Sequence, residues 1–279
     1  MGVRANTALE GATVVVTGGA RGIGRATAAA FAARGARVVI ADLDIDAAEA
    51  TAREIGDGAK AIEADVTSRG SFAAALDEAE SALGPLRVLV NNAGLMGVER
   101  FAEETDDATA RQVAVNLTGV LNGSKLAIPR MTAGGGGRLV NVASIAGKAG
   151  FAGAATYCAT KHAVVGLCEA LRSELRDTPV GVSLVMPGLV DTELTSGLPQ
   201  PRGMRKQTPE AVAEAIVKAV RRGRFDVYVP RSIGVTFRVR SMLPGPVRRG
   251  LESLAGGEDL LFDHDREERA AYIQRTTRA

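Results

Sequence analysis

Residues 13–31 read TVVVTGGARGIGRATAAAF, which is an apolar β-branched run, a glycine-rich loop and an Ala-rich stretch of helical period. The run predicts a buried strand. In the loop, Gly18 permits a tight turn, Gly22 lets backbone amides approach a pyrophosphate, and Gly24 permits close packing of helix on strand. The free amides and the dipole of the helix would hold the phosphates. The stretch predicts a dinucleotide-binding strand–loop–helix unit, although a tight turn without a ligand has the same pattern.

The alternation of apolar β-branched runs with Ala-rich helical stretches continues to about residue 225. Continuous apolar runs indicate strands buried on both faces, as in parallel sheets. We therefore expect an α/β fold, a doubly wound parallel sheet with helices on both faces, in a single domain over residues 1–225. The expected strands are 13–18, 37–42, 86–94, 137–144 and 181–188, and the expected helices are 22–34, 46–55, 69–83, 106–132, 156–176 and 208–222.

The composition excludes several classes of function. A net charge of +2 is too small for a nucleic-acid-binding protein. Two cysteines and two histidines provide neither a disulfide framework nor a His/Cys metal site, so we expect no metal. No run of 18 apolar residues predicts a transmembrane helix, and residues 1–11 lack the apolar core of a secretory signal. These features predict a cytoplasmic protein.

Composition changes after Arg221. Residues 221–249 hold eight arginines and one acid, whereas residues 250–268 hold seven acids and one arginine. We interpret 226–279 as a C-terminal extension that is too short and too polar to be an independent domain. Its arginines alternate with apolar residues, which is compatible with peripheral attachment to anionic lipid or with packing on a protein surface. Pro244 and Pro246 would interrupt a long helix there.

Two residues bear on the choice of cofactor. Asp42 ends the strand 37–42, about 20 residues after the glycine loop, where a carboxylate accepts hydrogen bonds from ribose hydroxyls and repels a 2′-phosphate. Arg21, in the loop itself, could instead bind a 2′-phosphate. We expect NAD in preference to NADP, because the carboxylate opposes the dianion directly. Asp42 could alternatively cap the following helix, a role open also to Asp44 and Asp46.

Further motifs follow in order, and together with the loop they resemble the short-chain dehydrogenase/reductase family over roughly residues 10–225. They are TGGARGIG (17–24), Asp65 and Val66, NNAG (91–94), Asn116, Ser144, YCATK (157–161), and Pro187, Gly188 and Thr192. The pair Tyr157 and Lys161 is weak evidence alone, since such a spacing arises by chance. The ordered series favours a catalytic interpretation, and the resemblance implies a Rossmann-like fold with the C-terminal extension appended.

The resemblance identifies four catalytic residues. Tyr157 would be the general acid and base, but a free tyrosine has a pKa of about 10. Lys161 lies one helical turn away on the same face, and a nearby cation lowers that pKa. Ser144 would hydrogen-bond the substrate oxygen, although it could be a helix cap, and Asn116 would hold a water that relays protons.

The resemblance also implies the cofactor site and the partners. Tyr157 and Lys161 would also contact the nicotinamide ribose, and the two long helices 106–132 and 156–176 would form a homodimer or homotetramer. Separately from the resemblance, residues 189–208 combine Gly, Pro and mixed polarity without clear periodicity, which is typical of a mobile lid over the substrate. Leu194, Leu198 and Met204 would supply apolar contacts there, and Leu95 and Met96 follow the NNAG motif. The other implied cofactor residues are Gly18, Arg21, Gly22, Ile23, Gly24, Asp42, Asp65, Val66, Asn92, Ala93, Gly94, Pro187, Gly188, Val190 and Thr192.

These features predict an oxidoreductase that transfers a hydride between NAD(H) and an apolar secondary alcohol or its ketone. No charged cluster indicates a phosphate or carboxylate substrate. One alternative is an NADPH-dependent ketone or 3-oxoacyl reductase. Another is a redox sensor that binds NAD without turnover, which would not need an activated tyrosine. An epimerase or dehydratase would by resemblance carry a shorter glycine spacing.

Overall fold

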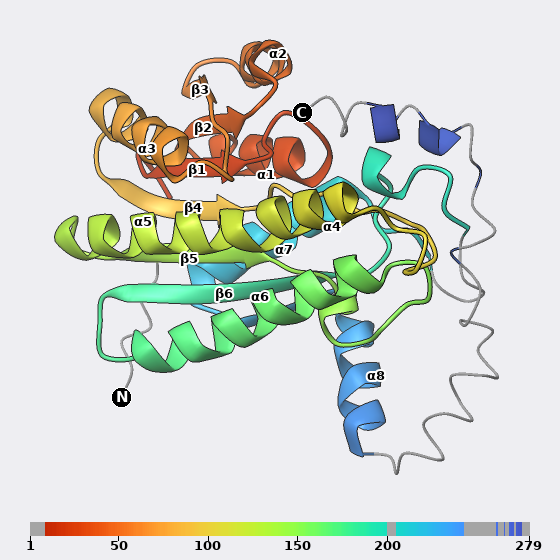
Figure 1. Ribbon diagram of the computed structural model, residues 1–279. Helices are drawn as coiled ribbons and strands as arrows, with labels where there is room; N and C mark the ends of the chain where they lie inside the picture. The colour runs from red at the N-terminus through yellow and green to blue at the C-terminus, as the bar shows by residue number, and fades with distance from the viewer. Residues whose placement is uncertain are drawn as a thin grey trace.

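A seven-stranded sheet organises the chain, with strands in the order β3-β2-β1-β4-β5-β6-β7 and every neighbouring pair parallel (Figure 1). The computed structural model describes residues 9–199, 205–242, 261, 265, 268–270 and 272–274. The strands are β1 (Thr13–Thr17), β2 (Arg37–Asp42), β3 (Ala59–Glu63), β4 (Leu86–Asn91), β5 (Gly137–Val142), β6 (Val180–Pro187) and β7 (Asp226–Val229).

Helices connect the strands. They are α1 (Gly22–Ala32), α2 (Ile45–Ile55), α3 (Arg69–Leu83), α4 (Asp106–Val113), η1 (Ala114–Thr118), α5 (Gly119–Ala133), η2 (Ile145–Gly147), α6 (Ala155–Glu174), η3 (Glu193–Thr195), α7 (Pro209–Arg222) and α8 (Arg231–Met242). The doubly wound α/β fold with helices on both faces is therefore confirmed.

The core consists of two layers, one on each face of the sheet. Phe72 of α3, Leu126 of α5 and Val164 of α6 pack with one set of strand side chains, and Phe31 of α1 and Ile216 of α7 pack with the other set. Successive residues of a strand point to opposite faces, so each apolar run supplies both layers. This explains why the strands read as continuous apolar segments.

Two strands lie outside the runs that the sequence predicts. Strand β3 is at one edge of the sheet, and only Ile62 among its residues is buried. Strand β7 has four residues and pairs with β6 from Leu184 to Pro187. The sheet therefore extends to Val229, and the boundary placed at residue 225 is too early by at least this strand. The lack of independent folding of the remaining extension stays a prediction.

The expected long helix 106–132 is interrupted. Helices α4 and α5 are joined by η1, a single π-helical turn of five residues. A π turn inserts one extra residue and is frequent at functional sites. It lets α4 face the cavity, which Arg111 and Ala114 line, while α5 packs on the sheet.

The C-terminal extension begins with α8, which ends at Met242. The sequence of the extension is compatible with lipid attachment, but its residues 243–260 lie outside the described residues. In the part of the chain that the structure describes, no helix combines the length and the apolar character needed to cross a membrane.

Candidate active site

A cavity of about 1130 Å³ opens at the carboxyl ends of the strands, around the point between β1 and β4 where the strand order reverses. Ligands bind in this position in open α/β sheets, and the volume lies slightly above the usual range of about 300–1,000 Å³ for small-molecule sites. Gly24 and Asn116 do not line it. All the other residues predicted for catalysis or cofactor binding do: Gly18, Arg21, Gly22, Ile23, Asp42, Asp65, Val66, Asn92, Ala93, Gly94, Ser144, Tyr157, Lys161, Pro187, Gly188, Val190 and Thr192.

The glycine loop needs its glycines for three separate geometric reasons. Gly18 has φ +59°, and a Cβ there would lie 2.8 Å from the Cα of Ala93. Gly22 has φ +51°, a left-handed conformation at the start of α1. At Gly24, a Cβ would lie 2.0 Å from the carbonyl oxygen of Gly18. Gly24 does not line the cavity. It acts indirectly, because a residue without a Cβ lets α1 pack closely against the glycine loop.

Replacing Gly24 by alanine is expected to destabilise the fold and weaken cofactor binding together. The added methyl meets backbone, which cannot rotate away, and such overpacking typically costs about 1–3 kcal/mol or more. Thermal unfolding and titration with NADH would measure the two effects. Gly70→Ala in α3 is the matched control, because a Cβ there meets no heavy atom within 4 Å. Unchanged NADH affinity in Gly24→Ala would contradict this account of the loop.

Asn92 fastens the glycine loop to the end of β4, a role that its motif alone did not reveal. Its Nδ2 donates to the carbonyl oxygens of Thr17 (3.0 Å) and Gly18 (3.1 Å). The hydroxyl of Thr17 accepts from the backbone N–H groups of Asn92 (3.0 Å) and Ala93 (3.2 Å). These four hydrogen bonds fix the two loops that face each other across the cavity.

Three charged residues at the tip of β2 have separate roles. Asp44 is the N-cap of α2, since its Oδ1 accepts from the N–H of Ala47 at 3.1 Å. Asp42 is therefore not needed as the cap. Its Oδ2 accepts from the N–H of Ala20 at 2.9 Å, which holds the carboxylate beside the glycine loop. Arg21 forms an ion pair with Asp44 at 2.6 Å, so its guanidinium is already engaged by a carboxylate.

The loops after β3 and β6 carry further predicted cofactor residues that line the cavity. Asp65 follows β3, and its carboxylate accepts from the N–H (2.8 Å) and hydroxyl (2.7 Å) of Thr67. Asp65 and the neighbouring Val66 both line the wall. Thr192 is the N-cap of η3 and forms a capping box with Thr195. A Cβ at Gly22 would lie 3.2 Å from Cγ2 of Thr192, so the loop after β6 closes over the glycine loop.

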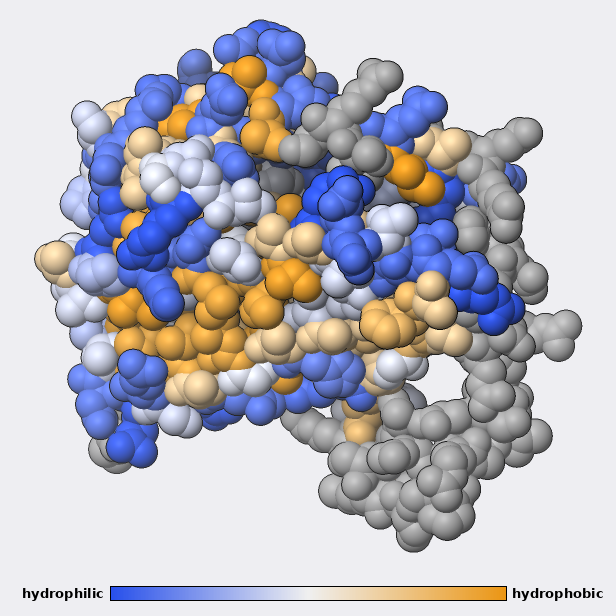
Figure 2. Space-filling model, viewed as in Figure 1, coloured by the Kyte–Doolittle hydropathy of each residue, from blue (hydrophilic) through white to orange (hydrophobic). Residues whose placement is uncertain are grey.

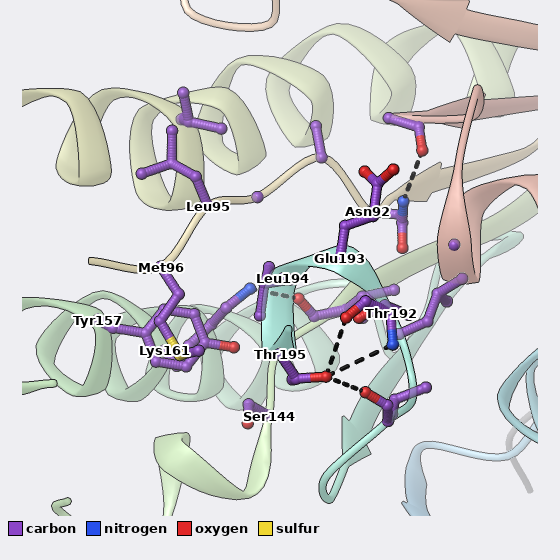
Figure 3. Close-up of a pocket in the computed structure, with 18 of the residues that line it drawn as sticks. Asn92, Leu95, Met96, Ser144, Tyr157, Lys161, Thr192, Glu193, Leu194 and Thr195 are labelled. Carbon is purple, nitrogen blue, oxygen red and sulfur yellow. Dashed lines mark hydrogen bonds between the residues drawn. The ribbon is translucent and has the colours of Figure 1, made fainter. Parts of the chain in front are cut away.

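Tyr157 and Lys161 project from α6 into the same part of the cavity, as Figure 3 shows. Both are buried, at 8 % and 4 % exposure. The Nζ of Lys161 lies 5.6 Å from the centre of the Tyr157 ring and donates to the carbonyl oxygen of Val142 at 3.0 Å. The pair is therefore held in a fixed orientation at the end of β5.

Burial, rather than the neighbouring Lys161, is the dominant influence on the pKa of Tyr157 in this structure. Burial raises the pKa of Tyr157 above its ordinary value, and the neighbouring Ser144 hydroxyl offsets this only in part. Burial also lowers the pKa of Lys161 to about 8. The physical reason is desolvation, which disfavours both the phenolate and the ammonium, and the ammonium is directed at a carbonyl oxygen.

Ser144 and Asn116 support the pair in different ways. The hydroxyl of Ser144 caps η2 by accepting from the N–H of Ala146 at 3.1 Å, so the cap and the contact with Tyr157 coexist. Asn116, in the π turn, is fully buried. Its amide accepts from the N–H and donates to the oxygen of Leu95, both at 2.8 Å. It therefore holds the loop after β4, and its role in proton relay stays a prediction.

Apolar side chains line the cavity next to Tyr157. The predicted Leu95, Met96, Leu194 and Leu198 are among them, whereas Met204 lies outside the described residues. Sequence patterns did not indicate Phe151, Leu261 or Tyr272, which also line this half. No group of three or more His, Cys, Asp or Glu residues within the described chain is placed to hold a metal ion.

The residues present fit a nicotinamide dinucleotide. The glycine loop offers backbone amides at the start of α1, and its left-handed Gly18 and Gly22 leave space that a side chain would fill. Asp42 offers a carboxylate for ribose hydroxyls. The half of the cavity lined by Ser144, Tyr157 and Lys161 is left for the reacting groups.

Comparison with known proteins agrees with this site. The family model described as short chain dehydrogenase matches residues 12–203. A sorbitol dehydrogenase of Cereibacter sphaeroides is 40% identical over 71% of this chain and 81% of its own. A 3-alpha-(or 20-beta)-hydroxysteroid dehydrogenase of Mycobacterium bovis is 38% identical over 69% of this chain and 74% of its own.

A solved structure extends the agreement to three dimensions. A short chain dehydrogenase/reductase from Burkholderia phymatum in complex with NAD superposes with a TM-score of 0.78 and 29% identity, covering 84% of this chain and 94% of its own. The ordered motifs, the parallel sheet and the cavity at its carboxyl edge agree with these matches. The chain therefore belongs to the short-chain dehydrogenase/reductase family and is an oxidoreductase that acts on CH–OH groups.

Proposed function

We propose that this protein transfers a hydride between NAD(H) and an apolar secondary alcohol or its ketone, with Tyr157 as the general acid and base. One observation carries the proposal: Ser144, Tyr157 and Lys161 line the same cavity as the glycine loop and Asp42. An acid–base group and a dinucleotide site are thus available to one bound substrate. The apolar side chains beside Tyr157 favour an apolar substrate.

The chain's own residues provide binding and proton transfer. When bound, NAD would supply the hydride acceptor and NADH the hydride donor. In oxidation, the oxygen of Tyr157 takes the hydroxyl proton of the alcohol, and in reduction it returns a proton to the carbonyl oxygen. Ser144 hydrogen-bonds that oxygen and stabilises its developing charge. Lys161 would hold the nicotinamide ribose, and the burial of Tyr157 and Lys161 limits the access of water to them.

Asp42 and Arg21 support NAD as the cofactor. The Asp42 carboxylate faces the cavity at the tip of β2, and Arg21 is paired with Asp44. A 2′-phosphate would meet the carboxylate and would have to draw Arg21 out of its ion pair. Both effects disfavour NADP.

Asp42→Asn tests the cofactor preference. The asparagine oxygen can still accept from the N–H of Ala20, but the charge is lost. We expect NADH binding to weaken roughly tenfold or more, because hydrogen bonds to charged groups contribute about 1.5–3 kcal/mol. The preference for NADH over NADPH should narrow as well. Calorimetry with both cofactors measures this, and Asp46→Asn, on an exposed residue of α2, is the control.

Two alternatives predict other outcomes in the same experiment. An NADPH-dependent ketone or 3-oxoacyl reductase requires tighter binding of NADPH, and Arg21→Ala would then weaken that binding. A redox sensor requires tight NADH binding without oxidation of any secondary alcohol. Failure of both cofactors to bind would overturn the proposed function as a whole.

We further propose that the protein forms a homodimer or homotetramer through α5 and α6. Figure 2 shows apolar residues over this part of the surface, and Ile128, Leu167 and Leu171 are only partly buried there. Light scattering of the purified protein measures the assembly, and a monomer would contradict this proposal.

The location in the cell is also a proposal. The two cysteines, Cys158 and Cys168, are free and buried, which fits a cytoplasmic setting. Peripheral contact with anionic lipid is supported by Val235 and Val239, which are exposed one turn apart on the arginine-bearing helix α8. Vesicle flotation with and without residues 232–279 tests this contact, and equal flotation would remove it.

A further inference from the structure

Part of the C-terminal extension returns to the active site. The N–H of Asp265 donates to the carbonyl oxygen of Gly197 at 2.8 Å, and residues 268–270 and 272–274 are helical. Gly197 has φ +71°, and a Cβ there would lie 2.6 Å from the oxygen of Asp265. The extension therefore packs in backbone contact on the loop that follows β6.

Arg269 joins two loops that are distant in sequence. It is 1 % exposed, and its guanidinium donates to the carbonyl oxygens of Met96 (2.6 Å), Leu194 (3.3 Å) and Ser196 (3.4 Å). Met96 belongs to the loop after β4, and the other two acceptors belong to the loop after β6. Burial lowers the pKa of Arg269, so these carbonyl oxygens are needed to keep the charge inside. The Arg269 guanidinium thus links the loop after β4 to the loop after β6, and both loops line the cavity.

Tyr272 completes the contact and faces the cavity. Its hydroxyl accepts from the N–H of Met96 at 2.9 Å, and its ring lies 5.2 Å from the guanidinium carbon of Arg269. It is 7 % exposed and lines the same half of the cavity as Tyr157, Phe151 and Leu198. The backbone of Met96 is therefore held on both sides, at its N–H by Tyr272 and at its oxygen by Arg269.

We infer that Asp265, Arg269 and Tyr272 form a C-terminal clasp in which Tyr272 is the wall that limits substrate size and Arg269 positions that wall. The inference rests on the proposed function, because it assigns the substrate half of the same cavity. A wall made of a tyrosine ring, Phe151, Met96 and Leu198 fits a compact apolar ring. The substrate class is therefore a cyclic secondary alcohol of about one ring, rather than a linear polyol.

Tyr272→Ala and Arg269→Gln test the clasp, with cyclohexanol and the two-ring 2-decalol as substrates and NAD as oxidant. In Tyr272→Ala we expect kcat/KM for 2-decalol relative to cyclohexanol to rise roughly tenfold, since even one methylene changes the discrimination of an apolar pocket about 10–200-fold. In Arg269→Gln we expect KM for cyclohexanol to rise roughly tenfold, while NADH affinity stays within about twofold. A linear polyol such as sorbitol should be a poor substrate of the wild type.

Hydrogen exchange provides a readout that is independent of turnover. The Met96 amide loses its acceptor in Tyr272→Ala, so a peptide containing Met96 should exchange at least about tenfold faster. The control for both measurements is Arg138→Gln in β5, because Arg138 is also a buried arginine, donating to the oxygen of Val182 at 3.1 Å. Arg138→Gln should lower stability without changing the ratio of the two alcohols or the exchange of Met96.

The outcomes separate the clasp from the proposed function. Unchanged Met96 exchange in Tyr272→Ala, or an unchanged ratio of the two alcohols, would overturn the clasp. If the wild type binds NADH but oxidises none of the alcohols, the proposed function fails, and the clasp's assignment of a cyclic alcohol fails with it. Exchange of Met96 then still decides whether the extension is docked as described.

Discussion

Tyr157→Phe is expected to slow alcohol oxidation by at least about 100-fold while the protein keeps its fold and its affinity for the cofactor. The substitution removes only the hydroxyl, and the ring stays in the apolar cluster with Met96 and Leu198. A positioned acid–base group contributes typically about 10²–10⁴-fold to the rate, and we expect a loss of kcat in that range. Steady-state kinetics with NAD and cyclohexanol, together with NADH calorimetry, measures the two properties separately.

The pH dependence of the wild type provides a second measure of the same group. Burial raises the pKa of Tyr157, so the phenol is the main form at neutral pH. Alcohol oxidation requires the phenolate form of Tyr157, so its rate should increase as pH rises. Carbonyl reduction requires the phenol form, so its rate should not increase with pH. Tyr228→Phe in β7 is the matched control, since Tyr228 does not line the cavity. If Tyr157→Phe retained more than about a tenth of the wild-type rate, Tyr157 would not be the general acid and base.

Lys161→Met is expected to remove activity and to increase stability. Lys161 is 4 % exposed, and burial lowers its pKa from 10.5 to about 8. A shift of this size corresponds to roughly 3 kcal/mol against the folded state. Losing the hydrogen bond to Val142 lowers the stability by about 1 kcal/mol. The net increase in the free energy of unfolding is therefore on the order of 1–3 kcal/mol. Turnover should fall at least about 100-fold, because Lys161 orients the reacting groups.

The stability gain should depend on pH in a definite direction. The folded pKa of Lys161 lies below the unfolded value, so the unfolded chain binds the proton more tightly. The destabilisation caused by burying the charged Lys161 is largest below pH 8 and decreases as pH rises toward 10.5. The difference between Lys161→Met and wild type, measured by chemical denaturation, should therefore shrink over that range. Lys125→Met, at an exposed position of α5, should show no such change, and a constant difference for Lys161→Met would contradict the assigned cause.

Strands and helices with a strong hydrophobic pattern in the sequence could be predicted closely, whereas those without such a pattern could not. Strand β2 (Arg37–Asp42) and helix α3 (Arg69–Leu83) have the predicted bounds, because a continuous apolar run and an amphipathic stretch are local properties. Strand β3 escaped because an edge strand with one buried residue does not read as an apolar run. Strand β7 is four residues long and follows an arginine-rich turn, so its composition resembled that of the extension.

The active site could be located from motifs, but its electrostatics and its far wall could not. The motif residues Ser144, Tyr157 and Lys161 meet because they follow or flank the carboxyl end of β5. The direction of the Tyr157 pKa depended on burial, which a motif does not encode. Arg269 lies in a polar stretch, and its burial is stabilised by carbonyl oxygens 73 to 173 residues away in the chain. No local pattern indicates contacts of that range.

The distribution of aromatic residues makes the site directly visible to spectroscopy. The chain contains three tyrosines and no tryptophan, and Tyr157 and Tyr272 both line the cavity. Near-ultraviolet absorbance and intrinsic emission therefore come largely from residues that surround the substrate, with only Tyr228 outside. Ionisation of the catalytic phenol, or binding of a ligand in the cavity beside either ring, would change a signal that no indole obscures. The protein thus carries its own optical probe of substrate binding, without a label.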